Sequence, residues 1–244
     1  MHLQRLNPSC RLRPLLATLA LAASLAACTT AQVRMPEGFA GHAMTYDVSG
    51  HSPRRFNEPL RFGPYSALEM VEGNTFSWAI PMSHAGLGHT SKPYAFTLVA
   101  INQPPVEVQC RVRTWTAGLG RVSKRLEVDL TGLAGPMMAC GMQLDGEKPM
   151  PLELSRTGTK MQGKLASPWG TAYDVRSISH MEGTPVANTA PTGYEIVGPE
   201  GIVAVVDVLN AGRVHLDAQL DEERRIYFAA ASAALLLLDP EIDG

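Results

Sequence analysis

The sequence predicts a mainly β fold: an antiparallel meander of about 11–12 strands that closes into a barrel or a sandwich, with one buried hydrophobic helix at the C-terminus. Three observations support this prediction. Apolar and polar residues alternate with a period of two along most of the chain, pairs of Gly and Pro separate these runs, and the last long segment is apolar on every side. With 45% hydrophobic and 18% charged residues among 244, the composition excludes a disordered chain and allows a large core.

The predicted strands follow from this alternation. It is clearest in residues 106–113, where Val and Cys occupy the even positions and Glu, Gln and Arg the odd ones. Residues 202–209 are nearly all apolar, which predicts a strand covered on both faces. Two Gly-Leu-Gly tripeptides, 86–88 and 118–120, are interpreted as turns between strands. Further strands are predicted around residues 44–48, 76–82, 94–100, 126–130, 140–144, 152–154, 173–175, 194–197 and 214–216.

The C-terminal segment, about 221–238, is predicted to be a helix that ends before Asp239-Pro240. Its three acidic residues, Asp221–Glu223, suit a helix N-terminus, where the helix dipole is positive. The thirteen residues from Ile226 to Leu238 are all apolar or small. As a helix they span only about 20 Å, less than the roughly 30 Å of a bilayer core. We therefore expect a core helix surrounded by the sheet rather than a membrane span.

The first 27 residues have the organisation of a signal peptide. Three arginines precede an apolar run of thirteen residues, Leu15–Ala27, which is too short to span a bilayer. The residues Leu25-Ala26-Ala27-Cys28 resemble the lipobox of bacterial outer-membrane lipoproteins. That resemblance implies cleavage before Cys28 and acylation of this cysteine, with palmitate among the acyl chains. Several acyl chains anchor a protein stably, whereas one chain binds a membrane only marginally.

The same resemblance implies a location. Thr29 stands where lipoproteins retained in the inner membrane usually carry Asp, so the anchor is expected in the outer membrane and the body in the periplasm. The expected organisation is a signal peptide (1–27), a lipidated tether (28–36) and a single β-rich periplasmic domain (37–244). The mature chain keeps all 23 acidic residues but loses three of the 21 basic ones, so its formal charge is −5 rather than −2. Without a basic excess, a nucleic-acid partner is not expected.

A strand-rich chain that ends in an apolar helix resembles the tubby-like and phospholipid-scramblase-like barrels, in which such a helix threads the barrel. The residues that carry this resemblance are Arg213–Leu216, Asp221–Glu223 and Ala229–Leu238. It implies a shape only, because no basic cluster of this sequence matches the family's phosphoinositide site. A half-open β-cup, similar to those of periplasmic lipoprotein-handling proteins, is the alternative architecture.

Two of the four cysteines are predicted to form a disulfide. Cys10 is lost with the signal peptide and Cys28 is lipidated, which leaves Cys110 and Cys140 in an oxidising compartment. Each cysteine is on the same face of its strand as the apolar residues, so the two can meet inside the fold if these strands are neighbours. Two buried free thiols are the alternative.

Catalytic and metal-binding motifs are sparse in this sequence. His84 and His89 flank a Gly-rich stretch and are the candidates for a metal site, although their spacing matches no zinc motif and a polar hairpin loop is the alternative. Asp207 lies between valines, where an acid is either functional or crosslinks the fold. The sequence contains no nucleophile elbow, HExxH helix or phosphate loop. His215 alternates with apolar neighbours on its strand and is expected to be exposed.

The sequence therefore favours a membrane-anchored lipoprotein with a structural or partner-binding role, not an enzyme, and without a cofactor. Its partners would be the outer membrane, through the N-terminal lipid, and an envelope protein or an apolar ligand. Two other functions stay open: a carrier of a lipid-like molecule, and an envelope hydrolase whose non-local site draws on His84, His89 and Asp207. A barrel filled by its helix would argue against the carrier, and an empty apolar cavity of several hundred Å³ would favour it.

Overall fold

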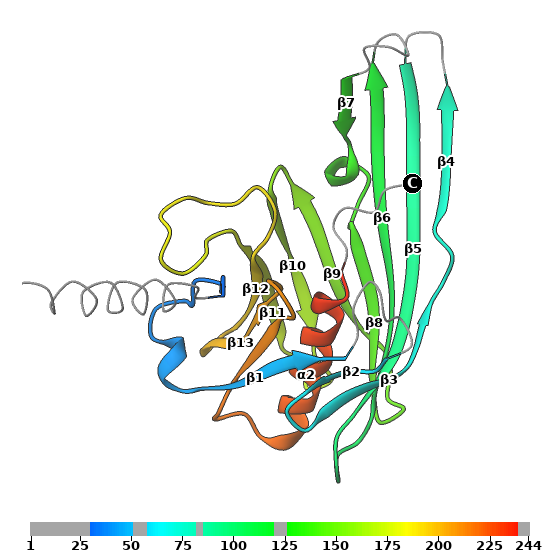
Figure 1. Cartoon of the computed structure of the whole chain (residues 1–244). Helices are drawn as coiled ribbons and strands as arrows, with labels where there is room; N and C mark the ends of the chain where they lie inside the picture. The colour runs from blue at the N-terminus through cyan, green and yellow to red at the C-terminus, as the bar shows by residue number, and fades with distance from the viewer. Residues whose placement is uncertain (1–29, 51–57, 82–84, 120–125, 239–244) are drawn as a thin grey trace, which may run out of the picture. The chain divides into compact units, whose positions relative to one another are not determined.

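The computed structural model describes residues 30–50, 58–81, 85–119 and 126–238. The chain divides into two units, Met1–Ala31 and Gln32–Gly244, and every strand and helix described below belongs to the second. In the described residues of that unit, fourteen antiparallel strands form one sheet, and twelve of them close into a barrel (Figure 1). The predicted mainly β fold with one buried C-terminal helix is confirmed.

The barrel is a meander, because each strand of the ring pairs with the next one along the chain. Pairing of the first strand with the last, and of β5 with β6, completes the ring. The ring consists of β1 (Ala43–Ser49), β2 (Leu60–Phe62), β3 (Tyr65–Glu72), β5 (Ala85–Val99), β6 (Val106–Leu119), β8 (Met138–Leu144), β9 (Met150–Thr157), β10 (Lys160–Ala166), β11 (Ala172–Ile178), β12 (Gly193–Gly198), β13 (Gly201–Asp207) and β14 (Arg213–Asp217).

The C-terminal helix α2 (Glu222–Leu236) lies inside this ring (Figure 1). Asp221 caps it by accepting a hydrogen bond from the backbone N–H of Arg224 at 2.8 Å. Ten consecutive residues, Ile226–Leu235, are buried, so the helix has no solvent-facing side over nearly three turns. Its six residues 229–234 are five alanines and a serine, which lets the helix backbone approach the barrel wall closely. A ring of this size is too wide for wall side chains alone to fill, and the helix supplies the missing core.

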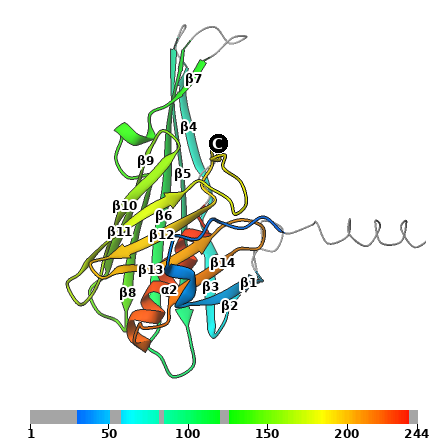
Figure 2. The ribbon, with the colours of Figure 1, turned by 90° about the vertical axis from the view of Figure 1, so that its left-hand side faces the viewer.

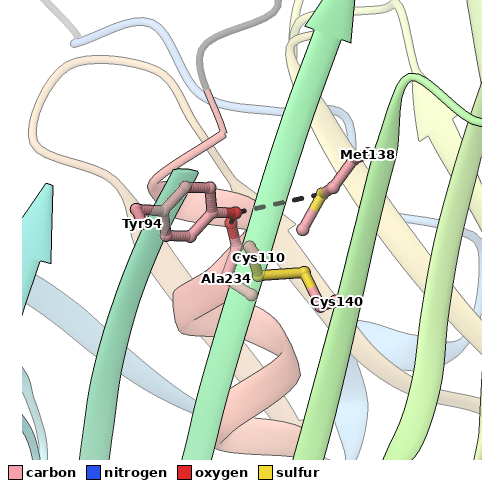
Figure 3. The surroundings of a disulfide bond; sticks show 5 residues. All are labelled: Tyr94, Cys110, Met138, Cys140 and Ala234. Atoms are coloured by element: carbon pink, nitrogen blue, oxygen red, sulfur yellow. Dashed lines mark hydrogen bonds between the residues drawn. A yellow bond between two sulfur atoms is a disulfide. The ribbon is translucent and has the colours of Figure 1, made fainter. Parts of the chain in front are cut away.

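The predicted disulfide is present and lies against the helix. Cys110 of β6 is directly opposite Cys140 of β8, and their sulfur atoms are bonded (Figure 3). On the neighbouring strand β5, the hydroxyl of Tyr94 donates a hydrogen bond to the carbonyl oxygen of Ala234 at 2.8 Å. Burial raises the pKa of Tyr94 far above its ordinary value, so this hydroxyl keeps its proton and stays a donor. The disulfide and this hydrogen bond tie three adjacent strands and the helix together.

Two strands of the ring continue beyond it. The outer parts of β5 and β6 pair with β4 (Phe76–Pro81) and β7 (Leu126–Asp129), which are not part of the ring. We call this four-stranded extension the arm: β4, residues 85–91 of β5, residues 114–119 of β6, and β7. Figures 1 and 2 show it rising above the other strands. Of the two Gly-Leu-Gly tripeptides predicted as turns, residues 86–88 and the described residues 118–119 lie instead in this sheet, where Gly86 is opposite Gly118.

Residues 32–42, which we call the strap, pack on the outside of the barrel (Figure 2). Val33 and the short 3-10 helix η2 (Phe39–Gly41) form a second apolar cluster with Val205 of β13. The strap covers the outer face of β13 while the barrel core covers its inner face, which explains why residues 202–209 are nearly all apolar. The second half of the tether predicted over 28–36 is thus part of the barrel body from Gln32 onward.

Candidate functional site

The interior of the barrel is occupied by protein. The helix residues Ile226–Leu235 and the inward side chains of the ring belong to one continuous apolar cluster. Near the C-terminal end of α2, a hollow lined by Met70, Lys92, Tyr94 and Leu237 measures about 20 Å³. That volume holds about one water molecule, far less than a lipid-like ligand needs.

The histidine candidates for a metal site are not brought into a ligand set. His84 lies outside the described residues. His89 lies in the arm on β5, and its ring contacts that of Trp115 edge-on with 4.4 Å between centroids. In the part of the chain that the structure describes, no three His, Cys, Asp or Glu side chains are grouped closely enough to hold a metal ion. The same described residues include no helix long and apolar enough to cross a membrane.

Asp207 holds the strap to the barrel. It is 3% exposed, and its carboxylate accepts hydrogen bonds from the backbone N–H of Val33 at 3.0 Å and of Leu209 at 2.8 Å. A second connection is made by backbone pairing, in which Arg34 donates to His180 and Glu182 donates to Gln32. This acid is therefore engaged by the backbone, and it fits the crosslinking alternative rather than the catalytic one.

His215 is buried, contrary to the sequence-based expectation of an exposed side chain. Only 9% of it is exposed, and its Nδ1 lies 2.8 Å from the hydroxyl of Thr45 on the adjacent strand β1. The expectation was wrong because the outer wall of β14 is covered here, next to the cluster that the strap forms on Val205. Burial is the main cause that lowers the pKa of His215, and Asp207 opposes it. The histidine is a wall residue rather than a surface group.

The arm carries a feature that the sequence alternation alone did not reveal. The pairing of β5 with β6 runs through fourteen residue pairs without a register shift, from Leu98 opposite Val106 to Ala85 opposite Leu119. Because successive side chains of a strand alternate between faces, each face of this hairpin continues unbroken from the barrel into the arm. The two faces can therefore be compared along their length.

The polarity of these faces reverses where the arm begins. In the barrel part of β6, the outer face carries polar residues, Glu107 to Arg113, and the inner face carries valines and Cys110. From Thr114 onward, the outer face carries Trp115 and Ala117, and the inner face carries Thr114 and Thr116. This reversal is visible in the sequence, because after Val112 the apolar residues of the strand occupy odd-numbered instead of even-numbered positions.

The outer side of the arm is consequently an apolar surface, which we call the arm face. Phe76 of β4 is 63% exposed and Val128 of β7 is 39% exposed. Its described members are Phe76, Leu87, His89, Trp115, Ala117 and Val128. On the opposite side, small polar residues replace them, and the hydroxyls of Ser77 and Thr90 lie 3.2 Å apart. An apolar face turned outward on a projecting sheet is a candidate interaction surface.

Comparison of the chain with protein-family models, with curated proteins and with solved structures finds no match.

We predict that Asp207→Ala releases the strap and lowers the free energy of unfolding by about 1–3 kcal/mol, because two backbone N–H groups lose their acceptor. The measurements are urea unfolding and amide hydrogen exchange of residues 33–42. The control is Asp174→Ala, which removes an exposed carboxylate paired with Lys164 and Arg176 and should leave the strap protected. Unchanged exchange in the strap of Asp207→Ala would show that Asp207 does not hold it.

Proposed function

We propose that the protein is a lipid-anchored envelope protein, held at the bacterial outer membrane through Cys28 with its barrel in the periplasm, and that it binds another envelope protein through the arm face. The arm face is the observation that carries this proposal. An exposed apolar surface on a soluble domain is costly in water and is retained where a partner covers it. The role is binding rather than catalysis.

The strap supports a close attachment to the membrane. Cys28 and Val33 are five residues apart, so a fully extended chain between their Cα atoms spans at most about 18 Å. Since Asp207 holds Val33 against β13, the acyl chains would keep this wall of the barrel near the membrane surface. The ring order places β12 and β13 across the barrel from β5 and β6, on which the arm is built. The arm face would thus remain free for a periplasmic partner.

The two alternative functions receive less support. A carrier needs an apolar cavity, and the space inside this ring is taken by the buried residues of α2. A hydrolase needs a nucleophile, a base and an orienting acid within hydrogen-bond reach. Of the predicted residues for such a site, Asp207 is bonded to the backbone beneath the strap, whereas His89 lies in the arm beside Trp115.

Cys28→Ser tests the anchor. We expect the variant to lose incorporation of a palmitate analogue and to keep the mass of the uncleaved chain, because acylation needs the thiol and cleavage before residue 28 follows acylation. Cys10→Ser, a change in the predicted signal peptide, is the matched control and should behave like the unchanged protein. Acylation that survives in Cys28→Ser would refute the proposed attachment.

Site-specific photocrosslinking in intact cells tests the arm face. A photoreactive residue at position 76 should give a covalent adduct with a protein. The same residue at position 101 should not, although Ile101 is 83% exposed and also apolar. Ile101 lies in the loop that joins β5 and β6 at the end opposite the arm. Comparing the two positions therefore distinguishes a specific binding surface from simple exposure of an apolar side chain. Equal labelling at both positions, or none at either, would overturn the assignment of the arm face.

A further inference from the structure

The two edges of the arm differ in how they are protected. β4 pairs with β5 on one side, and its other edge pairs with no strand in the described part of the chain. Edge strands of soluble proteins usually carry charges or bulges that prevent pairing with another chain. Residues 74–81 contain no charged side chain, and Pro81 stands only at the last position of β4. The β4 edge therefore lacks the usual protection.

The other edge is protected. β7 has only four residues, and two of them, Glu127 and Asp129, are acidic. If two copies of β7 paired, acidic residues would be brought together, which destabilises a sheet. Two copies of β4 would bring together only uncharged residues, three of which, Phe76, Trp78 and Ile80, have high β propensity. Charge thus permits self-pairing at one edge and opposes it at the other.

We propose that the protein self-associates by antiparallel pairing of β4 with β4 of a second copy, which joins two arms into one eight-stranded sheet. A two-fold axis relates the copies, so the contact closes on itself and forms a dimer rather than a filament. The proposal rests on the proposed function, because it assigns a second copy of this chain as the first partner of the arm.

The size of the arm face supports a second copy. Four strands spaced about 4.8 Å apart and six residues long, at about 3.3 Å per residue, present a face of roughly 380 Å². A stable protein interface buries about 800 Å² on each partner, so one arm face is too small for it. Two arms joined at β4 present about 760 Å² on one continuous side. Self-pairing would therefore bring the binding surface to the size that an envelope partner needs.

The symmetry fixes which residues meet. In an antiparallel pair, two directly opposite residues either both form hydrogen bonds to the partner strand or both do not. These two kinds of residue pair alternate along the strand. A two-fold axis must therefore place one residue opposite its own copy. The registers that retain five residue pairs of β4 are centred on Trp78 or on Ala79. In the first, Ser77 faces Ala79 of the other copy, and in the second, Ala79 faces itself.

Cysteine crosslinking of the full chain in its membranes tests this geometry. Ser77 and Ala79 are exposed and small, and Cys110 and Cys140 are already bonded to each other. We expect a disulfide-linked dimer either from Ala79→Cys alone or from Ala79→Cys co-expressed with Ser77→Cys, since facing β-carbons lie about 5 Å apart. Val128→Cys on the β7 edge is the matched control and should remain monomeric on non-reducing gels. No dimer from any of the β4 variants, or an equal amount from Val128→Cys, would overturn the proposal.

A charged variant separates this proposal from the proposed function. Ala79→Lys should abolish the dimer, because it places a charge on the β4 edge, while the Cys110–Cys140 disulfide shows that the barrel has folded. If the β4 cysteine variants give no dimer while photocrosslinking at position 76 gives an adduct with a different protein, self-pairing is wrong and the partner-binding function stands. If photocrosslinking yields no protein adduct at all, both are wrong. An adduct of twice the chain's mass that Ala79→Lys removes is the result we expect.

Discussion

Inside the twelve-stranded ring, an apolar helix and an apolar wall bury one another, and neither would be stable in water without the other. A helix without a polar side needs to be surrounded, and a ring of this width needs a filling that its own side chains cannot supply. The hydroxyls of Tyr94 and Tyr227 reinforce the fit by donating to the carbonyl oxygens of Ala234 and Ala166, one in the helix and one in the wall. Since the helix fills the interior, the surfaces that remain accessible lie on the outside of the barrel.

The outside is divided between two opposite walls. On one wall, Asp207 fixes the strap, which would limit how far the barrel could move from Cys28 if this cysteine is acylated as proposed. On the other wall, β5 and β6 extend beyond the ring and exchange the polarity of their faces, which produces the arm face. In the proposed function, the first wall serves attachment and the second wall serves recognition. A rigid barrel between them would present the arm face at a fixed position relative to the membrane.

Much of the fold could be predicted from the sequence, because strand alternation, an all-apolar helix and the parity of Cys110 and Cys140 are local signals of burial. What covers a strand is not local. Val33 and Asp207 are 174 residues apart in sequence, and Thr45 and His215 are 170 apart, so neither the strap nor the burial of His215 could be read from their neighbours. The arm face was missed for another reason. Its parity shift after Val112 is visible, but alternation does not say which face is turned toward solvent.

Amide hydrogen exchange of the full chain extracted from membranes tests the central claim, that α2 fills the barrel permanently and leaves binding to its surface. We expect the amides of residues 226–235 to exchange as slowly as those of β6 and β8, because all of them are released only by global unfolding. Faster exchange in the helix than in these strands would contradict it. Such a result would mean that α2 leaves the ring and that the interior opens to a ligand.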